Sequence, residues 1–322
     1  MNNSHRLYVG TIGEGLWRST DGGETFVRAI DGMFVECHVR ALVVHPHDDR
    51  VLYLGNEHGV YRSDDGANNW TRVDSPATGM QIWSILLAPG NPDLILVGAC
   101  PSRLFRSDDA GRSWTEPSVR MQQGCPRIIN TRVTSLCGHP GDPHTFWAGV
   151  EIDGVYRSKD GGRTWQSVGK GLSSQDIHAL KYVPGNPGRL LASTNNDLNV
   201  SLDDGETWQS LGLGKTLPLP YFRGMAQHAS KPNVIFLGNG DAPPGTTGLI
   251  ARSLDGGTTW QPADFPGRAN STLWNFAVHP ADHELVYANS VSGQIYRSRD
   301  GGATWHKLSR EFGEIRALAW TP

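Results

Sequence analysis

The sequence lacks the features that mark membrane proteins and nucleic-acid-binding proteins. No stretch approaches the roughly 18 apolar residues of a transmembrane helix, and the first residues, Met1–Arg6, contain no apolar signal-peptide core. The formal net charge is only −3, which gives no sign of a basic nucleic-acid surface. We therefore expect no membrane or nucleic-acid partner and a cytoplasmic location, although a trimmed exported protein would look the same. The oligomeric state is left open.

Cysteine is also scarce, and its spacing matches neither a disulfide framework nor a CxxC motif. The four cysteines are free thiols in the simplest interpretation, and a Cys100–Cys125 bridge between two loops is the alternative; the other two are Cys37 and Cys137. Glu36-Cys37-His38 and Glu57-His58 contain metal-ligand residue types, but their spacing matches no metal motif. We expect no metal and no other cofactor.

What the sequence has in abundance is glycine, proline and one recurring pattern. Apolar residues make up 38%, with 39 Gly and 20 Pro, which favours many short strands and turns over helices. Ser-x-Asp-x-Gly-x-x-Trp, or a close variant, starts seven times, 43 to 52 residues apart, at Ser19, Ser63, Ser107, Ser158, Ser201, Ser253 and Ser298. Such a period predicts a circular or solenoid array of similar units.

The chemistry of this repeat predicts a turn with an anchor. The Ser and Asp oxygens can accept hydrogen bonds from nearby backbone N–H groups, and Gly supplies the positive φ that a tight turn needs. The aromatic ring seven places after the Ser then enters the core, where its burial contributes about 1.5–3 kcal/mol. Two copies deviate slightly, because Phe26 replaces Trp in the first and Ala67 replaces Gly in the second.

The repeat resembles the Asp-box, or bacterial neuraminidase repeat, of β-propellers, and seven copies cover the whole chain. The resemblance implies a β-propeller; proteins with this repeat include sialidases, xyloglucan-active glycoside hydrolases, sortilin and a photosystem II assembly factor. Because all of them share the repeat, it does not select one activity.

One unit is expected to contain four strands, at residues 39–44, 51–54, 59–62 and 70–73. The chain starts out of phase: residues 7–9 and 15–18 are a second and a third strand, and the missing first strand reappears at residues 314–320. We therefore predict an all-β fold with one domain, residues 1–322, forming a seven-bladed propeller of about 28 strands. The last strand should close the ring against the first three and so remove exposed sheet edges.

Loops in a propeller alternate between two faces, so the repeat turns should lie on one face. The loops that lead into each new blade, and the loops between second and third strands, should lie on the other face, which we call the loop face. The extra residues of the two long periods lie on the loop face, at 116–131, 212–221 and 240–248. Insertions gathered on one side of a repeat array typically mark the binding side.

Residues that recur in most blades are expected to be structural, so the informative positions are those that differ. The arginines before the repeat serines belong to the first kind. One position near the loop-side end of each innermost strand belongs to the second, and we call its occupants the ring residues: Arg40, Trp83, Thr134, His178, Arg223, Trp274 and Arg316. Two places earlier stand His38, Gln81, Arg132, Asp176, Tyr221, Thr272 and Glu314. Both sets should converge on the mouth of the central channel.

These residue types predict a site for a small anionic or carbohydrate-like ligand. Arg40, Arg223 and Arg316 would bind a carboxylate or phosphate, although pairing with neighbouring carboxylates to brace the ring is about equally expected. Trp83 and Trp274 would form flat walls. His178 with Asp176 would transfer a proton, and Tyr221 completes the predicted catalytic set. Further ligand-binding candidates are Arg132, Glu57, Glu151 and Asp241.

No catalytic set transfers from the resembling families. Arg40, Arg223, Arg316 and Tyr221 are similar to part of the sialidase set, but sialidase propellers have six blades and an Arg-Ile-Pro motif, whereas Arg127-Ile128 is followed here by Ile129. Xyloglucan-active relatives place their acids between two propellers. The assembly-factor group is nearer in length and blade number, and its members bind partners. The sequence thus favours a hydrolase or lyase acting at the mouth, with a non-catalytic platform for a protein or glycan as the alternative.

Overall fold

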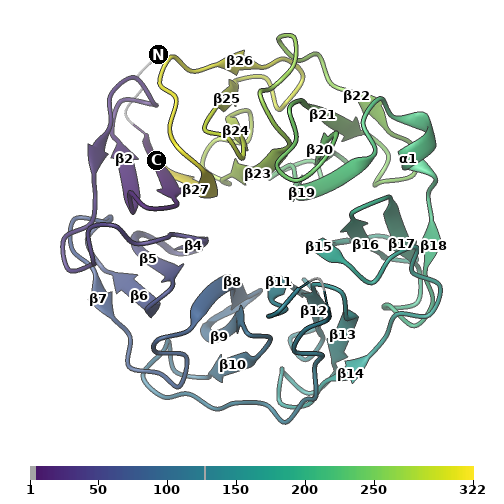
Figure 1. Ribbon diagram of the computed structural model, residues 1–322, viewed down its shortest axis with the longest axis horizontal. Coiled ribbons are helices and arrows are strands. Elements are labelled where there is room, and N and C mark those ends of the chain that lie inside the picture. Colours follow the sequence, from purple (N-terminus) through teal and green to yellow (C-terminus); the bar gives the residue numbers. More distant parts are fainter. Residues whose placement is uncertain (1–4, 127) are drawn as a thin grey trace.

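The computed structural model is a closed ring of seven β-sheets (Figure 1), and it describes residues 5–126 and 128–322. The innermost strands of the sheets line a central channel. Two parts of the sequence interpretation touch residues outside this description, namely the Met1–Ser4 end of the first segment and Arg127 of the Arg127-Ile128 pair. The seven-bladed, antiparallel, all-β fold expected from the repeat is confirmed.

The blades follow one another around the ring, each built from consecutive strands that run from the channel outward, except for the first (Figure 1). Blade 1 contains β27 (Ile315–Thr321), β1 (Arg6–Thr11), β2 (Leu16–Ser19) and β3 (Val27–Arg28). Blade 2 contains β4 (Ala41–His45), β5 (Asp48–Asn56), β6 (Gly59–Ser63) and β7 (Thr71–Arg72). Blade 3 contains β8 (Gln81–Ala88), β9 (Asn91–Cys100) and β10 (Leu104–Ser107). Blade 4 contains β11 (Val133–Gly138), β12 (Phe146–Val150), β13 (Gly154–Ser158) and β14 (Gln166–Ser167).

The remaining three blades have the same order. Blade 5 contains β15 (Ile177–Val183), β16 (Arg189–Thr194), β17 (Leu198–Ser201) and β18 (Gln209–Ser210). Blade 6 contains β19 (Tyr221–Gln227), β20 (Ile235–Gly240), β21 (Gly248–Ser253) and β22 (Gln261–Pro262). Blade 7 contains β23 (Leu273–Val278), β24 (Val286–Ser290), β25 (Ile295–Ser298) and β26 (His306–Lys307).

Two details differ from the sequence prediction. The described chain has 27 strands instead of about 28, because the outermost strand of blade 3 is reduced to a single bridge between Arg106 and Thr115. One helical turn, α1 (Leu213–Thr216), occupies the long loop before blade 6. With four residues this turn is far too short to cross a bilayer, and nothing else in the described ranges forms a membrane-spanning helix.

The ring closes through strands from opposite ends of the sequence. β1 pairs with β27 in an antiparallel register that runs from Arg6 opposite Thr321 to Thr11 opposite Ile315. β1 also pairs with β2 on its other side, so blade 1 is completed only by the C-terminal strand. The predicted closure is therefore confirmed.

The repeat forms the expected turn in all seven copies. In blade 2 the Ser63 hydroxyl donates to Asp65 at 2.9 Å and accepts from the Ala67 amide at 2.9 Å, while Asp65 accepts from the Asn69 amide at 3.0 Å. In the other six copies too, the backbone N–H of the fifth repeat residue donates to the hydroxyl of the repeat Ser. Ala67 adopts a φ of 64°, so this copy keeps the turn without glycine at the fifth position.

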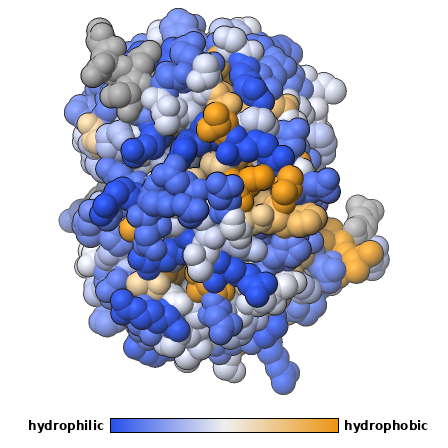
Figure 2. All heavy atoms as spheres, turned by 90° about the vertical axis from the view of Figure 1, so that its left-hand side faces the viewer, coloured by the Kyte–Doolittle hydropathy of each residue, from blue (hydrophilic) through white to orange (hydrophobic). Residues whose placement is uncertain are grey.

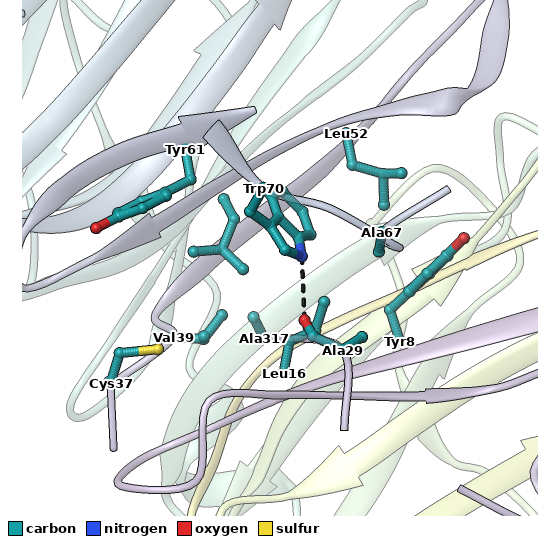
Figure 3. Close-up of a cluster of buried hydrophobic side chains, with 11 residues drawn as sticks. Tyr8, Leu16, Ala29, Cys37, Val39, Leu52, Tyr61, Ala67, Trp70 and Ala317 are labelled. Carbon is teal, nitrogen blue, oxygen red and sulfur yellow. Dashed lines mark hydrogen bonds between the residues drawn. The ribbon is translucent and has the colours of Figure 1, made fainter. Parts of the chain in front are cut away.

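The apolar core is divided among the seven interfaces between blades. Seven clusters of buried apolar residues each combine side chains from two neighbouring blades. Figure 3 shows the cluster between blades 1 and 2, where Trp70 packs near Leu16 and Ala29 of blade 1. The Trp70 indole N–H also donates to the Ala29 carbonyl at 3.0 Å. The aromatic residue of the repeat thus joins its own blade to the preceding one.

The repeat arginines join each blade to the next one. Arg18 donates to the Gly66 carbonyl at 2.9 Å, Arg106 to Gly161 at 2.7 Å, and Arg297 to Gly22 at 2.9 Å. Each acceptor is the fourth residue of the next repeat, and Arg62, Arg157 and Arg252 contact the same position. Blade 5 has Val200 instead, and Arg189 of β16 donates to the equivalent Gly256 carbonyl at 3.1 Å. The structural role expected for these arginines is confirmed.

The cysteine alternatives are also resolved. All four cysteines are free, with Cys37 and Cys137 buried, so the Cys100–Cys125 bridge is not formed. Within the described ranges, no cluster of three or more His, Cys, Asp or Glu side chains could hold a metal ion.

The side of the ring along β2 and β7 is mainly polar. Figure 2 views the ring from the side of β2 and β7, where most atoms are hydrophilic and apolar residues gather toward one edge. Among the exposed large apolar residues, three lie in loops that lead into a new blade: Phe34 (58% exposed), Val35 (51%) and Ile129 (88%). These loops belong to the loop face.

Candidate functional site

A β-bulge occurs at six of the seven ring residues. The register of the innermost strand against its neighbour skips Trp83, Thr134, His178, Arg223, Trp274 and Arg316. Arg40, the seventh, directly precedes β4. A bulged residue is released from the regular alternation of the ladder and its side chain is re-aimed, as is common beside functional sites. The bulges therefore explain how a repeated scaffold points unlike side chains into the channel.

At five of the seven positions, the residue two places earlier contacts the ring residue. Arg40 lies 3.3 Å from both the carbonyl oxygen and the Nδ1 of His38, and the indole N–H of Trp83 donates to Gln81 at 3.4 Å. Asp176 lies 3.3 Å from His178, and Arg223 donates to the Tyr221 hydroxyl at 3.3 Å. Arg316 forms an ion pair with Glu314. Five ring residues are thus oriented by their own strand or its immediate extension.

The ring residues surround a cavity in the channel, and a second, larger cavity opens at the loop face. The channel cavity has a volume of about 280 Å³ and is lined by all seven ring residues. The mouth cavity has a volume of about 530 Å³, within the usual range for small-molecule sites. His178, Arg223, Trp274 and Arg316 line both cavities.

Each of the three long loops supplies part of the wall of the mouth cavity. Ile128 comes from the first loop, Pro220 from the second, and Asp241, Ala242 and Pro243 come from the third. Blades 2 and 3 contribute no lining residue to this cavity. The three insertions therefore build the wall of the mouth along blades 4 to 6.

Four guanidinium groups and two indole rings form one cluster at the boundary of the two cavities. Arg132 lies 4.2 Å, Arg40 5.3 Å and Arg316 6.0 Å from the Trp83 ring centroid. Arg223 lies 4.0 Å and Arg316 4.2 Å from the Trp274 ring centroid. Both indole rings were expected to form flat walls for a ligand, but each already packs against guanidinium groups of the protein. Cation–π attraction between the rings and the guanidinium groups positions the arginines.

The arginines of this cluster fall into two classes. Arg132 pairs with Glu151 at 2.5 Å, and Arg316 pairs with Glu314, as the bracing alternative predicts. Within the described part of the chain, Arg40 and Arg223 have no carboxylate within ion-pair distance. Burial lowers the pKa of Arg40, and it lowers that of Arg316 to about 10 even though Glu314 opposes the shift. The cluster is thus an incompletely neutralised, partly dehydrated group of cations.

His178 is held in a defined orientation by backbone and side-chain partners. Its Nδ1 lies 2.6 Å from the Phe222 carbonyl, so this nitrogen carries a hydrogen and donates. Its Nε2 faces Asp176 at 3.3 Å and the Tyr221 hydroxyl at 3.4 Å. Burial, followed by the charge of Arg223, lowers the pKa of His178, which favours the neutral ring. Burial alone would raise the pKa of Asp176, but His178, Arg223 and Arg132 hold it below its ordinary value.

The structure brings together most, but not all, of the predicted site residues. Nine of them line the mouth cavity: Arg132, Glu151, Asp176, His178, Tyr221, Arg223, Asp241, Trp274 and Arg316. Arg40 and Trp83 line the channel cavity only. Glu57 lines neither cavity, because its carboxylate accepts the His38 amide at 2.7 Å in blade 2.

Five residues of the mouth were missed by sequence reasoning. Each lies in a loop of irregular backbone, and they are Ile128, Asn195, Pro220, Ala242 and Pro243. The length of the loops around Ile128 and Pro220 was a usable signal, but the sequence gave no hint of which residue in each loop turns inward.

Comparison with family models places the chain among β-propeller families. A model described as the DUF6242 beta propeller domain matches residues 142–313, just over half of the chain. The chain belongs to the DUF6242 β-propeller family. A second model, described as sortilin, neurotensin receptor 3, matches residues 14–133, so the two matches cover different parts of this DUF6242-type propeller.

The curated relatives of this DUF6242-type propeller are xyloglucanases. Xyloglucanase Xgh74A of Acetivibrio thermocellus is 26% identical over 306 residues, which cover 82% of this chain and 29% of that enzyme. A xyloglucanase of Hypocrea jecorina is 30% identical over 47% of this chain and 17% of its own length. The chain therefore spans less than a third of these relatives.

Solved structures of similar shape support the fold alone. The structure titled "YCF48 bound to D1 peptide" superposes with a TM-score of 0.61 at 18% identity, covering 94% of this chain and 88% of that chain. YCF48 from Cyanidioschyzon merolae superposes with a TM-score of 0.58 at 15% identity, covering 85% of this chain and 87% of that chain. Identities this low carry no conclusion about activity.

Proposed function

We propose that the protein is a hydrolase or lyase that acts on a small anionic, sugar-like molecule in the mouth cavity. The observation that carries this proposal is the cluster of four arginines around Trp83 and Trp274, in which Arg40 and Arg223 have no carboxylate partner among the described residues. A structural brace would be expected to neutralise every guanidinium, because an unpaired cation is costly even where it is only partly buried, as Arg40 and Arg223 are.

An anion in the mouth would relieve this cost. A carboxylate at Arg223 would accept charge-assisted hydrogen bonds from its guanidinium and add attraction to Arg316 and Arg132 nearby. A cavity of about 530 Å³ has room for one or two sugar units of the kind that the xyloglucanase relatives act on as polymers. These features support a ligand that combines a carboxylate with a polar ring.

The acid–base groups lie beside the same arginine. Tyr221 contacts Arg223, and His178 contacts both Tyr221 and Asp176. A ligand bound to Arg223 would therefore lie within reach of groups that can donate or accept a proton. This juxtaposition supports a catalytic role and not binding alone.

Calorimetric titration with D-glucuronate tests the binding part of the proposal, and D-glucose serves as the neutral comparison. Arg223→Met should weaken glucuronate binding by about tenfold or more, because a charged hydrogen bond contributes about 1.5–3 kcal/mol. Arg112→Ala is the matched control, since Arg112 is exposed on the opposite face. Equal affinity for glucuronate and glucose, or an unchanged affinity in Arg223→Met, contradicts the proposal.

A second candidate, favoured by the exposed apolar residues of the loop face, is a non-catalytic platform for a protein or glycan. Phe34, Val35 and Ile129 are more than half exposed there. The similarly shaped YCF48 carries a peptide according to its title. Loss of a captured partner in Phe34→Ser and Ile129→Ser, with glucuronate binding absent from the wild type, would favour this platform.

A further inference from the structure

The carboxylates of the mouth are poorly suited to glycoside hydrolysis. That reaction usually needs two carboxyl groups about 5–9.5 Å apart, one of which is kept protonated by a raised pKa. Asp241 accepts the Thr246 amide at 2.9 Å and its hydroxyl at 2.8 Å, and these bonds hold its pKa below the ordinary value although burial opposes them. The pKa of Asp176 also lies below its ordinary value, and the Glu151 carboxylate forms an ion pair with Arg132. Among the described lining residues, no carboxyl group is set up as the proton donor.

Tyr221 and His178 form the remaining acid–base pair of the mouth. The Tyr221 hydroxyl lies 3.4 Å from the His178 Nε2 and 3.3 Å from the Arg223 Nη1. Because the His178 Nδ1–H donates to the Phe222 carbonyl, the Nε2 of the neutral ring has a lone pair that can accept the phenolic proton. Asp176 lies 3.3 Å from that Nε2 and would stabilise the imidazolium that results.

We propose that the mouth catalyses β-elimination from a 4-linked uronate, with Tyr221 as the proton-transfer group and His178 as its relay. This inference rests on the proposed anion site and adds the reaction type and the substrate class. In a 4-linked uronate the carboxylate is attached to the carbon that loses a proton, and the leaving oxygen is on the neighbouring carbon. Arg223 would hold the carboxylate beside the Tyr221 hydroxyl.

The atoms and electrons balance without water or a cofactor. The Tyr221 oxygen takes the proton from C5 of the sugar while its own proton passes to the His178 Nε2. The C5–H electron pair forms the C4–C5 double bond, and the bond from C4 to the linking oxygen breaks. The linking oxygen takes a proton from Tyr221, and His178 returns its proton to the phenolate. Arg223 and Arg316 stabilise the negative charge that develops on the carboxylate as C5 loses its proton.

Incubation with oligogalacturonate and oligomannuronate tests the inference, because the unsaturated product absorbs in the ultraviolet. We expect absorbance to rise with at least one of these uronates and not with cello-oligosaccharide, which has no carboxylate. Tyr221→Phe should lower kcat by about 100-fold or more with KM nearly unchanged. Tyr182→Phe is the matched control, because the Tyr182 hydroxyl also contacts a histidine, His139 at 2.9 Å, but lines neither cavity.

The failures of the two proposals can be told apart. If glucuronate binds through Arg223 but neither uronate yields an unsaturated product, the elimination is wrong and the anion site stands. If glucuronate does not bind, the proposed function itself fails. Nitrogen NMR adds a test that needs no substrate: His178 should be protonated on Nδ1 in its neutral form. A neutral ring protonated on Nε2 could not accept the Tyr221 proton, and it would overturn the relay.

Discussion

The two faces of the propeller use the same blades in opposite ways. On the repeat face, seven similar turns satisfy their own hydrogen bonds, and an arginine connects each blade to the next. On the loop face, bulges at equivalent positions present unlike residues, from Thr134 to His178 and Arg316. Similar residues at equivalent positions thus mark the framework, and different residues at equivalent positions mark the candidate site.

This comparison separates stability from function. Residues of the repeat face should affect unfolding and leave ligand binding unchanged, whereas Arg223 and Tyr221 should do the reverse.

Removal of the closing strand should have the largest effect. Deleting Gly313–Pro322 removes β27, exposes the edge of β1 and opens the cluster between blades 7 and 1. We expect an unfolded or aggregating chain, measured by circular dichroism and size-exclusion chromatography. A monomeric product with the melting temperature of the full chain would show that closure is not needed.

Arg106→Ala should lower the free energy of unfolding by about 1–3 kcal/mol, since it leaves a buried carbonyl without its charged donor. Arg106 is 5% exposed and donates to the Gly161 carbonyl at 2.7 Å across the interface between blades 3 and 4. Urea denaturation measures the change, with Arg112→Ala as the exposed control. A loss equal to that of the control would refute the blade-to-blade role of this arginine.

The repeat aspartates should make stability depend on acid pH. Hydrogen bonds from the Asn69 side chain and amide lower the pKa of Asp65 to about 2, whereas an unfolded Asp has a pKa of about 3.9. Because the folded pKa is the lower one, the contribution is present above pH 4 and is lost as the pH falls toward 2. Because Asp65 is solvent-exposed, we expect it to contribute less than about 1 kcal/mol to the free energy of unfolding. Between pH 5 and about 2, the free energy of unfolding should fall less steeply in Asp65→Asn than in the wild type.

Arg223→Met should change stability least. Its guanidinium has no ion pair among the described residues and packs 4.0 Å from the Trp274 ring centroid, where an apolar side chain can replace it. We expect a free energy of unfolding within about 1 kcal/mol of the wild-type value, measured by urea denaturation. A larger loss would assign Arg223 to the framework.

Most of the fold and part of the site could be predicted from the sequence. The repeat spacing fixed the number of blades, and the out-of-phase ends indicated closure. The two-residue spacing indicated that Asp176 lies beside His178 and Tyr221 beside Arg223. Sequence could not show the pairing of Arg132 with Glu151, or that Glu57 turns to the His38 amide, because these depend on bulges and loop backbones. The same holds for Asn195 and Pro220, which enter the mouth from irregular loops.

A crystal structure of the protein soaked with D-glucuronate would show whether the mouth binds an anionic sugar. We expect density in the mouth cavity with the ligand carboxylate within hydrogen-bond distance of the Arg223 guanidinium and the sugar ring beside Tyr221. An empty mouth at a saturating concentration, or Arg40 and Arg223 paired with carboxylates of the protein itself, would contradict this expectation.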